Sequence, residues 1–238
     1  RQYLGLTMTE IDTLIGKGKK QISMSAVSIG DAGPYAAADA AVTMRAAYYL
    51  RQELDSQHLL TLFNTLEMPM IPVIAAIEQA GVALDLSFLA DMSQRLGTQL
   101  DDIEDRIYEL SDGYGSFNIN SPKQLNDVLF NQLGLPVKDL RKTSHGYSTD
   151  VTSLEMLKDQ HPIVSEILSY RELSKLKGTY VDALPELVNP HTGRLHTSYN
   201  QTGTTTGRFS SSDPNLQNIP IRTEQGREVR RAFVAPPG

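Results

Sequence analysis

The chain has 238 residues, a hydrophobic content of 40% and a formal net charge of −6 at pH 7, which allows one large globular domain or parts of two or three. It contains no cysteine, which excludes disulfides, cysteine-ligated zinc and a thiol nucleophile. We find no run of about 18 apolar residues that predicts a membrane span and no secretory leader, so we expect a cytoplasmic protein.

Charge is distributed unevenly along the chain. Residues 1–110 carry 8 basic and 15 acidic side chains, residues 111–189 carry 8 and 10, and residues 190–238 carry 6 arginines and 3 acidic side chains. A surface that faces a polyanion therefore belongs at the C-terminal end or in local clusters. The alternative is that a modest excess of arginine is routine on a protein surface.

The N-terminal part predicts helices separated by turns. The first runs from Pro34, which suits the first helical position, to about Leu54, through a stretch rich in alanine. Residues 59–79 form a second helix, which Pro69 and Pro72 should kink or divide.

A long amphipathic helix is predicted over 86–111, with Asp85 as its N-cap. Residues 59–79 and 86–111 are joined by a short link, so we expect them to pack antiparallel as a helical hairpin. The apolar positions of the second helix keep helical spacing: Leu89, Met92, Leu96, Leu100, Ile103, Ile107 and Leu110.

Shorter helices follow in the next part of the chain. Ser121 and Pro122 predict a helix start, Gln124 would complete a capping box, and Gly134 marks the end. Residues 136–149 read as a polar loop, followed by a short helix near 150–159. Pro162 then opens a helix whose predicted buried face is Ile163, Ile167, Tyr170, Leu173, Leu176 and Tyr180.

Beyond Arg194 the pattern changes to short extended pieces at 196–200 and 229–234, with a loop between them. Residues 206–222 of this loop lack hydrophobic periodicity, and Asp213-Pro214 imposes a turn. Several side chains in it have fixed hydrogen-bonding geometry: Arg208, Asn215, Gln217, Asn218 and Arg222. The stretch resembles the TGR(L/F)SS-x-DPNLQNIP(V/I)R signature of family A DNA polymerases, the bacterial polymerase I type.

The resemblance extends from about residue 10 to residue 238. Residues 170–180 resemble the YREL-x-KLK-x-TY segment of the polymerase thumb. Residues 117–125 resemble the FN-x-NS-x-x-QL motif of the thumb tip, and residues 142–149 resemble a KT-x-x-G-x-ST loop that clamps the DNA backbone. Residues 35–40 are similar to the third motif of a 3′–5′ exonuclease.

The resemblance implies a mainly α fold with a minor β part. Residues 1–60 would be the end of an RNase H-like α/β exonuclease domain. Residues 61–188 would form the helical thumb, a long antiparallel helix hairpin with shorter helices. Residues 189–238 would begin the α+β palm with its first antiparallel strands and the loop that holds the primer terminus.

The resemblance also implies an activity for a parent protein, namely DNA-directed DNA polymerase (a nucleotidyltransferase) in replication and repair. It would act with two Mg²⁺ ions on palm aspartates. Its partners would be primer–template DNA, deoxynucleoside triphosphates and the rest of the palm and fingers. The family pattern puts the catalytic aspartates after residue 238, so this segment alone should be inactive. The alternatives are a non-catalytic duplex-binding module and part of a 3′–5′ exonuclease.

Candidate DNA contacts come from both chemistry and resemblance. Arg171 and Lys175 share one helix face and offer a fork and a point charge to phosphate, although a solvated face is the alternative. The helix start at Ser121 is either a phosphate site or an ordinary cap, and the Lys142 loop either a clamp or a surface loop without a role. The resemblance implies DNA contacts from Asn120, Ser121, Lys142, Thr143, Ser148, Arg171, Lys175, Lys177, Thr179, Arg208, Ser210, Asn215, Gln217, Asn218 and Arg222.

Arg208 has a more specific expected role. The DNA minor groove presents acceptors at similar places on every Watson–Crick pair, so an arginine fork donating there senses pairing without reading sequence. The resemblance implies this role for Arg208 and minor-groove or template contacts for the neighbouring amides. Those amides could instead brace the loop by bonding its own backbone.

Tyr35 and Asp39 are four residues apart on a predicted helix and share a face. The resemblance implies that Asp39 binds a divalent metal and that Tyr35 positions the attacking water of a two-metal exonuclease. One carboxylate cannot hold two metals, so we expect no exonuclease activity from this segment alone.

Overall fold

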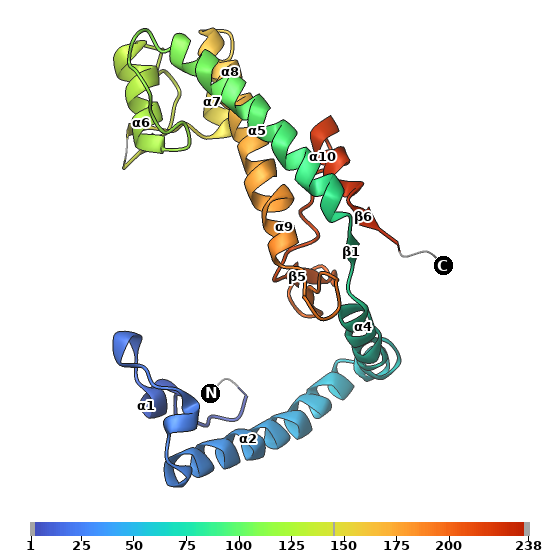
Figure 1. The fold of residues 1–238 in the computed structure, drawn as a ribbon. Helices are drawn as coiled ribbons and strands as arrows, with labels where there is room; N and C mark the ends of the chain where they lie inside the picture. The colour runs from blue at the N-terminus through green and yellow to red at the C-terminus, as the bar shows by residue number, and fades with distance from the viewer. Residues whose placement is uncertain (1–2, 145, 236–238) are drawn as a thin grey trace. The chain divides into compact units, whose positions relative to one another are not determined.

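Figure 1 shows a computed structural model of the chain, which describes residues 3–144 and 146–235. The chain divides into two compact units, Arg1–Ala75 and Ala76–Gly238. Helices dominate, and the strands in the described ranges form two-stranded antiparallel sheets, so the predicted mainly α class with a minor β part is confirmed. Position 145 of the predicted polar loop and the last three positions of the predicted palm segment lie outside the described residues.

The first unit is built around α2 (Ile29–Ser56). The Ser28 hydroxyl oxygen accepts a hydrogen bond from the Asp31 backbone N–H at 3.2 Å and caps the first turn. The predicted start at Pro34 is therefore too late, because a proline inside the helix removes a single backbone hydrogen bond and the other turns keep theirs. Short helical elements precede α2, namely α1 (Asp12–Ile15), η1 (Gly18–Lys20) and η2 (Met24–Ala26).

The helical run after α2 changes geometry earlier than predicted. A π-helical turn, η3 (Phe63–Glu67), separates α3 (Leu60–Leu62) from α4 (Met68–Ala80), whereas Pro69 and Pro72, which were expected to kink or divide the helix, both lie within α4. Contrary to the expectation that no segment could span a membrane, Leu60–Ala80 is long and apolar enough to cross one, with a mean hydropathy of 1.5. A single such helix is weak evidence, because core helices of soluble proteins meet the same criteria.

The second unit begins with the predicted long helix, α5 (Leu86–Glu109), whose cap is confirmed because Asp85 Oδ1 accepts from the Phe88 backbone N–H at 2.9 Å. Its packing partner is α8 (Pro162–Leu176), which runs antiparallel to it (Figure 1). The expected pairing of α5 with residues 59–79 is therefore wrong. The link before α5 does not simply reverse the chain, since it contains β1 (Ala83–Leu84), which pairs with a strand near the C-terminus.

Apolar and polar contacts together hold α8 on α5. The predicted stripe of α5 is largely buried, and Ile163 and Ile167 of α8 are fully buried against the same core. Each such side chain stabilises the fold by about 1.5–3 kcal/mol. At the edge of the interface, Arg106 donates to Glu166 Oε2 from Nε at 3.1 Å and from Nη2 at 2.9 Å. The chain after α8 stays helical through η5 (Lys177–Val181) and α9 (Ala183–Glu186).

Between α5 and α8 the chain forms a small subassembly at one end of the helix pair (Figure 1). The predicted cap is confirmed, because Ser121 Oγ accepts from the Gln124 backbone N–H at 3.5 Å. The capping box does not form, because Gln124 Oε1 accepts from the Asn118 N–H at 2.6 Å instead. The elements here are α6 (Pro122–Asn126), η4 (Asp127–Gln132), β2 (Lys142–Thr143), β3 (Gly146–Tyr147) and α7 (Val151–Leu157).

The C-terminal part contains β4 (Ser198–Asn200), β5 (Ser210–Ser212), α10 (Glu224–Arg230) and β6 (Phe233–Val234). The expected extended piece at 229–234 is wrong in its first half, where the chain is helical. Thr223 Oγ1 caps α10 by accepting from the Gly226 N–H at 3.2 Å. An ion pair of 2.5 Å between Arg95 and Glu228 then joins α10 to α5.

Candidate nucleic-acid interface

A groove of about 600 Å³ lies between the end of α8 and the predicted signature loop. Lys175 lines one side of the groove and Arg222 the other, and both residues are exposed. The Tyr180 hydroxyl donates to the Asn218 carbonyl oxygen at 2.6 Å and so fixes the two walls relative to each other. The structure thus brings together two cations that are far apart in the sequence, in a groove open to solvent.

The amides of the signature loop brace the loop itself. Asn215 Oδ1 accepts from the Gln217 backbone N–H at 2.9 Å, and Gln217 Nε2 donates to the Phe209 carbonyl at 2.8 Å. Ser210 is half-buried in β5, where it pairs with Asn200 of β4. These contacts agree with the bracing role that the sequence left open for the amides, and Asn218 lines the groove.

Arg208 differs from its neighbours because its side chain is exposed and uncommitted. Its carbonyl accepts from Thr204 Oγ1 at 2.7 Å, which holds the backbone of the loop. Among the residues that the structure describes, no hydrogen bond or ion pair engages its guanidinium, and no bridge joins it to Asp213. Its planar fork of donors is therefore available to an acceptor from outside the chain.

The four predicted contacts on α8 and η5 separate into two kinds. Lys175 and Thr179 are exposed. Lys177 Nζ instead lies 2.7 Å from Asp182 Oδ2 and 3.0 Å from Ser93 Oγ. Desolvation opposes the ionisation of Asp182, but the hydrogen bonds from Lys177 and Ser93 outweigh it and lower the pKa of this carboxyl. Arg171 is half-buried and also donates within the fold.

Predicted contacts at the thumb-tip motifs lie on two neighbouring segments. Asn120 Nδ2 donates to Ser174 Oγ of α8 at 3.2 Å. In the hairpin, Lys142 Nζ lies 5.7 Å from the centre of the Tyr147 ring, and Thr143 Oγ1 donates to the Gly146 carbonyl at 3.0 Å. Lys142 and Thr143 are exposed. Of the two predicted serine contacts here, Ser148 is buried, and Ser121 is half-buried with its hydroxyl capping α6.

Two residues that matter for this geometry had no signal in the sequence. Asn126 is buried and donates from Nδ2 to the Tyr147 carbonyl at 2.7 Å, which holds the hairpin against α6. The Tyr180 hydroxyl joins the two walls of the groove, although its ring was expected only as part of a buried face. Both bonds join segments that are distant along the chain, so no local motif could indicate them.

Asp150 caps α7 beside the hairpin and makes a pH-dependent contribution to stability. Hydrogen bonds from the Ser153 backbone N–H and from the Ser148 and Ser153 hydroxyls lower the pKa of Asp150 from 3.8 to about 2. Because the folded pKa is depressed, the stabilisation is complete above about pH 4 and is lost as the pH falls towards 2. We expect Asp150→Ala to lower the unfolding free energy at pH 7 by about 1 kcal/mol.

The control for this prediction is Asp150→Asn, which keeps an N-capping oxygen but removes the charge. Denaturant unfolding between pH 2 and 7 should show a flatter pH dependence for this variant than for the wild type, confined to the acidic end. An unchanged profile in both variants would show that the charge of Asp150 has no part in stability.

Tyr35 and Asp39 lie one helical turn apart on α2 in the first unit, as predicted. Desolvation, the charge of Asp39 and a hydrogen bond to its carboxylate raise the pKa of Tyr35. Within residues 3–144 and 146–235, no group of three or more His, Cys, Asp or Glu residues could hold a metal ion. The pair is therefore present, but the described part of the chain supplies Asp39 with no companion ligands.

Comparison with known proteins gives a consistent result. The family described as "DNA polymerase family A" matches residues 86–238. The chain is 50% identical to DNA polymerase I of Chloroflexus aurantiacus over 97% of its own length and 25% of that protein. It is 44% identical to DNA polymerase I of Pseudomonas aeruginosa over 100% of its length and 26% of that protein.

A solved structure also matches, the POL domain of Pol1 from M. smegmatis in complex with DNA primer-template and dNTP. The identity is 42% and the TM-score 0.72, over 81% of this chain and 33% of that one. The chain spans about a quarter of the length of the curated relatives it matches. On the matched residues and these identities, the chain belongs to DNA polymerase family A.

Proposed function

We propose that this chain is the thumb and the beginning of the palm of a DNA-directed DNA polymerase, and that it grips the primer–template duplex. The observation that carries the proposal is the groove between α8 and the signature loop, which has Lys175 and Arg222 on opposite walls. A backbone of phosphates is held by such cations without regard to sequence. The matched M. smegmatis polymerase, a relative with the same fold here, was solved with DNA primer-template and dNTP.

In this proposal the described residues have three different roles toward the duplex. Lys175 and Arg222 contact phosphates along the groove, and exposed Thr179 contacts the backbone beside it. Asn120, Ser121 and the Lys142–Thr143 strand contact the backbone further along the duplex. Arg208 donates its free fork to the minor-groove edge of the terminal primer pair. Asn215 and Gln217 keep the loop in shape, so that the fork needs no rearrangement when DNA binds.

The complete enzyme would add deoxynucleotides to a primer 3′ end in the cytoplasm, in replication and repair, with deoxynucleoside triphosphates and Mg²⁺. Among the described residues, no group of three or more His, Cys, Asp or Glu residues could hold that ion. In this proposal, residues 1–60 are the end of an exonuclease-like domain, residues 61–188 are the thumb and residues 189–238 are the start of the palm. Tyr35 and Asp39 support the first assignment.

Salt dependence of duplex binding tests the groove. Each phosphate contact contributes about 0.9 to the slope of log K against log salt concentration. We expect the full chain to bind primer–template duplex with a clear salt dependence, and Lys175→Ala to reduce the slope by about one contact. Fluorescence anisotropy over a salt series measures it.

The matched control is Lys158→Ala, because Lys158 is an exposed lysine of the same unit that pairs with Glu155 away from the groove. This variant should bind with the wild-type slope. A slope near zero for the wild-type chain, or equal slopes for the wild type and Lys175→Ala, would contradict the assignment of DNA to this groove.

A further inference from the structure

Arg171 and Lys175 lie one turn apart on α8 but differ in their exposure to solvent. Lys175 is exposed at the groove. Arg171 is half-buried, and burial lowers the pKa of its guanidinium from the ordinary value. A residue placed for contact with phosphate would be expected to show the exposure that Lys175 has, so the burial of Arg171 calls for a different role.

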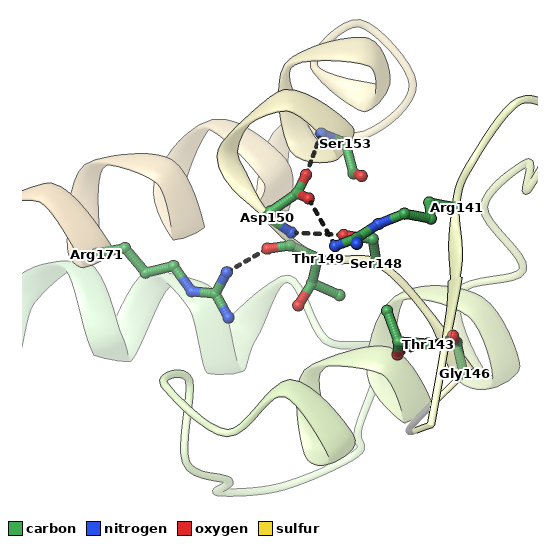
Figure 2. A network of polar contacts seen from close by, with 8 residues as sticks. All are labelled: Arg141, Thr143, Gly146, Ser148, Thr149, Asp150, Ser153 and Arg171. Carbon is green, nitrogen blue, oxygen red and sulfur yellow. Dashed lines mark hydrogen bonds and ion pairs between the residues drawn. The ribbon is translucent and has the colours of Figure 1, made fainter. Parts of the chain in front are cut away.

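The donors of Arg171 are directed at two main-chain carbonyls. Nη1 donates to the Thr149 oxygen and Nη2 donates to the Ile119 oxygen at 3.3 Å. Figure 2 shows the side chain reaching from α8 to the Thr149 carbonyl. Both acceptor residues are buried, so removal of the guanidinium would leave their oxygens without this partner.

Each carbonyl belongs to a segment with candidate DNA contacts. Ile119 directly precedes Asn120 and Ser121. Thr149 follows Ser148, whose backbone N–H donates to the Arg141 carbonyl at 2.7 Å. Arg141 directly precedes Lys142 in the first strand of the hairpin. The two segments also share the walls of a hollow of about 460 Å³, which Arg171 lines.

We propose that Arg171 is a positioning residue, which fastens the Asn120–Ser121 turn and the Lys142 hairpin to α8 so that both meet the same DNA backbone. This rests on the proposed function, because it assumes that the two segments touch DNA. The fork geometry suits the task, since a planar guanidinium reaches two diverging acceptors and the single ammonium of a lysine does not.

The test is a pair of double-mutant cycles on duplex binding by the full chain. Lys142→Ala alone should weaken binding by about 2- to 5-fold, the range of an exposed charge contact. In the Arg171→Ala background it should add almost nothing, because the hairpin is already displaced. In the parallel cycle, Lys175→Ala should weaken binding by the same factor in either background, because Lys175 stands on the helix itself.

Hydrogen exchange without DNA supplies a readout that a phosphate contact would not move. Arg171→Ala should speed exchange at 118–121 and at 146–149, and Lys175→Ala should leave both segments at wild-type rates. If the alanine variant fails to fold, Arg171→Lys is measured instead. A positioning role predicts that Arg171→Lys loses both the exchange protection of the two segments and the affinity for duplex DNA. If Arg171 bound phosphate directly, Arg171→Lys would keep most of the affinity.

The outcomes separate the two ideas. If Lys142→Ala and Lys175→Ala both leave binding unchanged, the proposed function fails. If both weaken binding but the effects of Lys142→Ala and Arg171→Ala multiply in full, with wild-type exchange rates in Arg171→Ala, the positioning role is overturned and the proposed function stands. Non-multiplying effects together with faster exchange at both segments support the positioning role.

Discussion

Replacing Arg208 by alanine is expected to slow primer extension by roughly ten- to a hundredfold in the complete polymerase of our proposal, with primer binding changed far less. The guanidinium is exposed and unengaged within the described fold, so its loss disturbs no internal contact. It removes a charge-assisted hydrogen bond worth about 1.5–3 kcal/mol. Because that bond matters most when the primer terminus is aligned for attack, the loss should appear in the rate. Single-turnover extension and equilibrium binding measure the two quantities.

A modified primer identifies the atom that Arg208 contacts. A 3-deaza purine at the primer terminus removes the N3 acceptor and should slow the wild type by a similar factor. It should barely slow Arg208→Ala further, because one partner of the bond is already missing. Arg208→Lys should restore only part of the rate, since lysine lacks the planar fork. Full additivity of the analogue and the mutation would show that Arg208 contacts some other group.

Replacing Gly81 by alanine is expected to lower the unfolding free energy of the second unit by roughly 3 kcal/mol or more. Gly81 has a φ of +61°, and an added Cβ would lie 2.7 Å from His196 Cε1 and 2.8 Å from the Leu195 carbonyl oxygen. That oxygen cannot move freely, because it accepts from the Val82 N–H at 2.7 Å while the Leu195 N–H donates to Val82 at 2.8 Å. The variant therefore combines backbone strain with damage to this pair of hydrogen bonds. Denaturant unfolding of the full chain gives the free energy.

Gly113→Ala is the matched control, because Gly113 also has a positive φ, +76°, but a Cβ there would meet nothing within 4 Å. This variant should cost only the backbone strain of about 1–2 kcal/mol. Equal losses in the two variants would mean that the contacts with Leu195 and His196 have no influence on stability.

The sequence by itself determined the features that depend on neighbours along the chain. The caps at Asp85 and Ser121 were predicted correctly, because the capping oxygen and the N–H it satisfies are three residues apart. The buried stripe of α5 follows from helical periodicity alone. The signature loop indicated the family, which the comparisons confirmed.

Tertiary structure alone decided which distant segments meet. The pairing of β1 with β6 set the course of the link before α5, and α8 became the partner of that helix, which no local pattern could express. The same holds for Arg171, which the sequence placed on one helix face with Lys175, and for Lys177, which the resemblance implied as a DNA contact. In the folded chain, Arg171 donates to main-chain carbonyls and Lys177 to a carboxylate. Such pairing is favourable because a buried or half-buried acceptor without a hydrogen-bond donor raises the free energy of the fold.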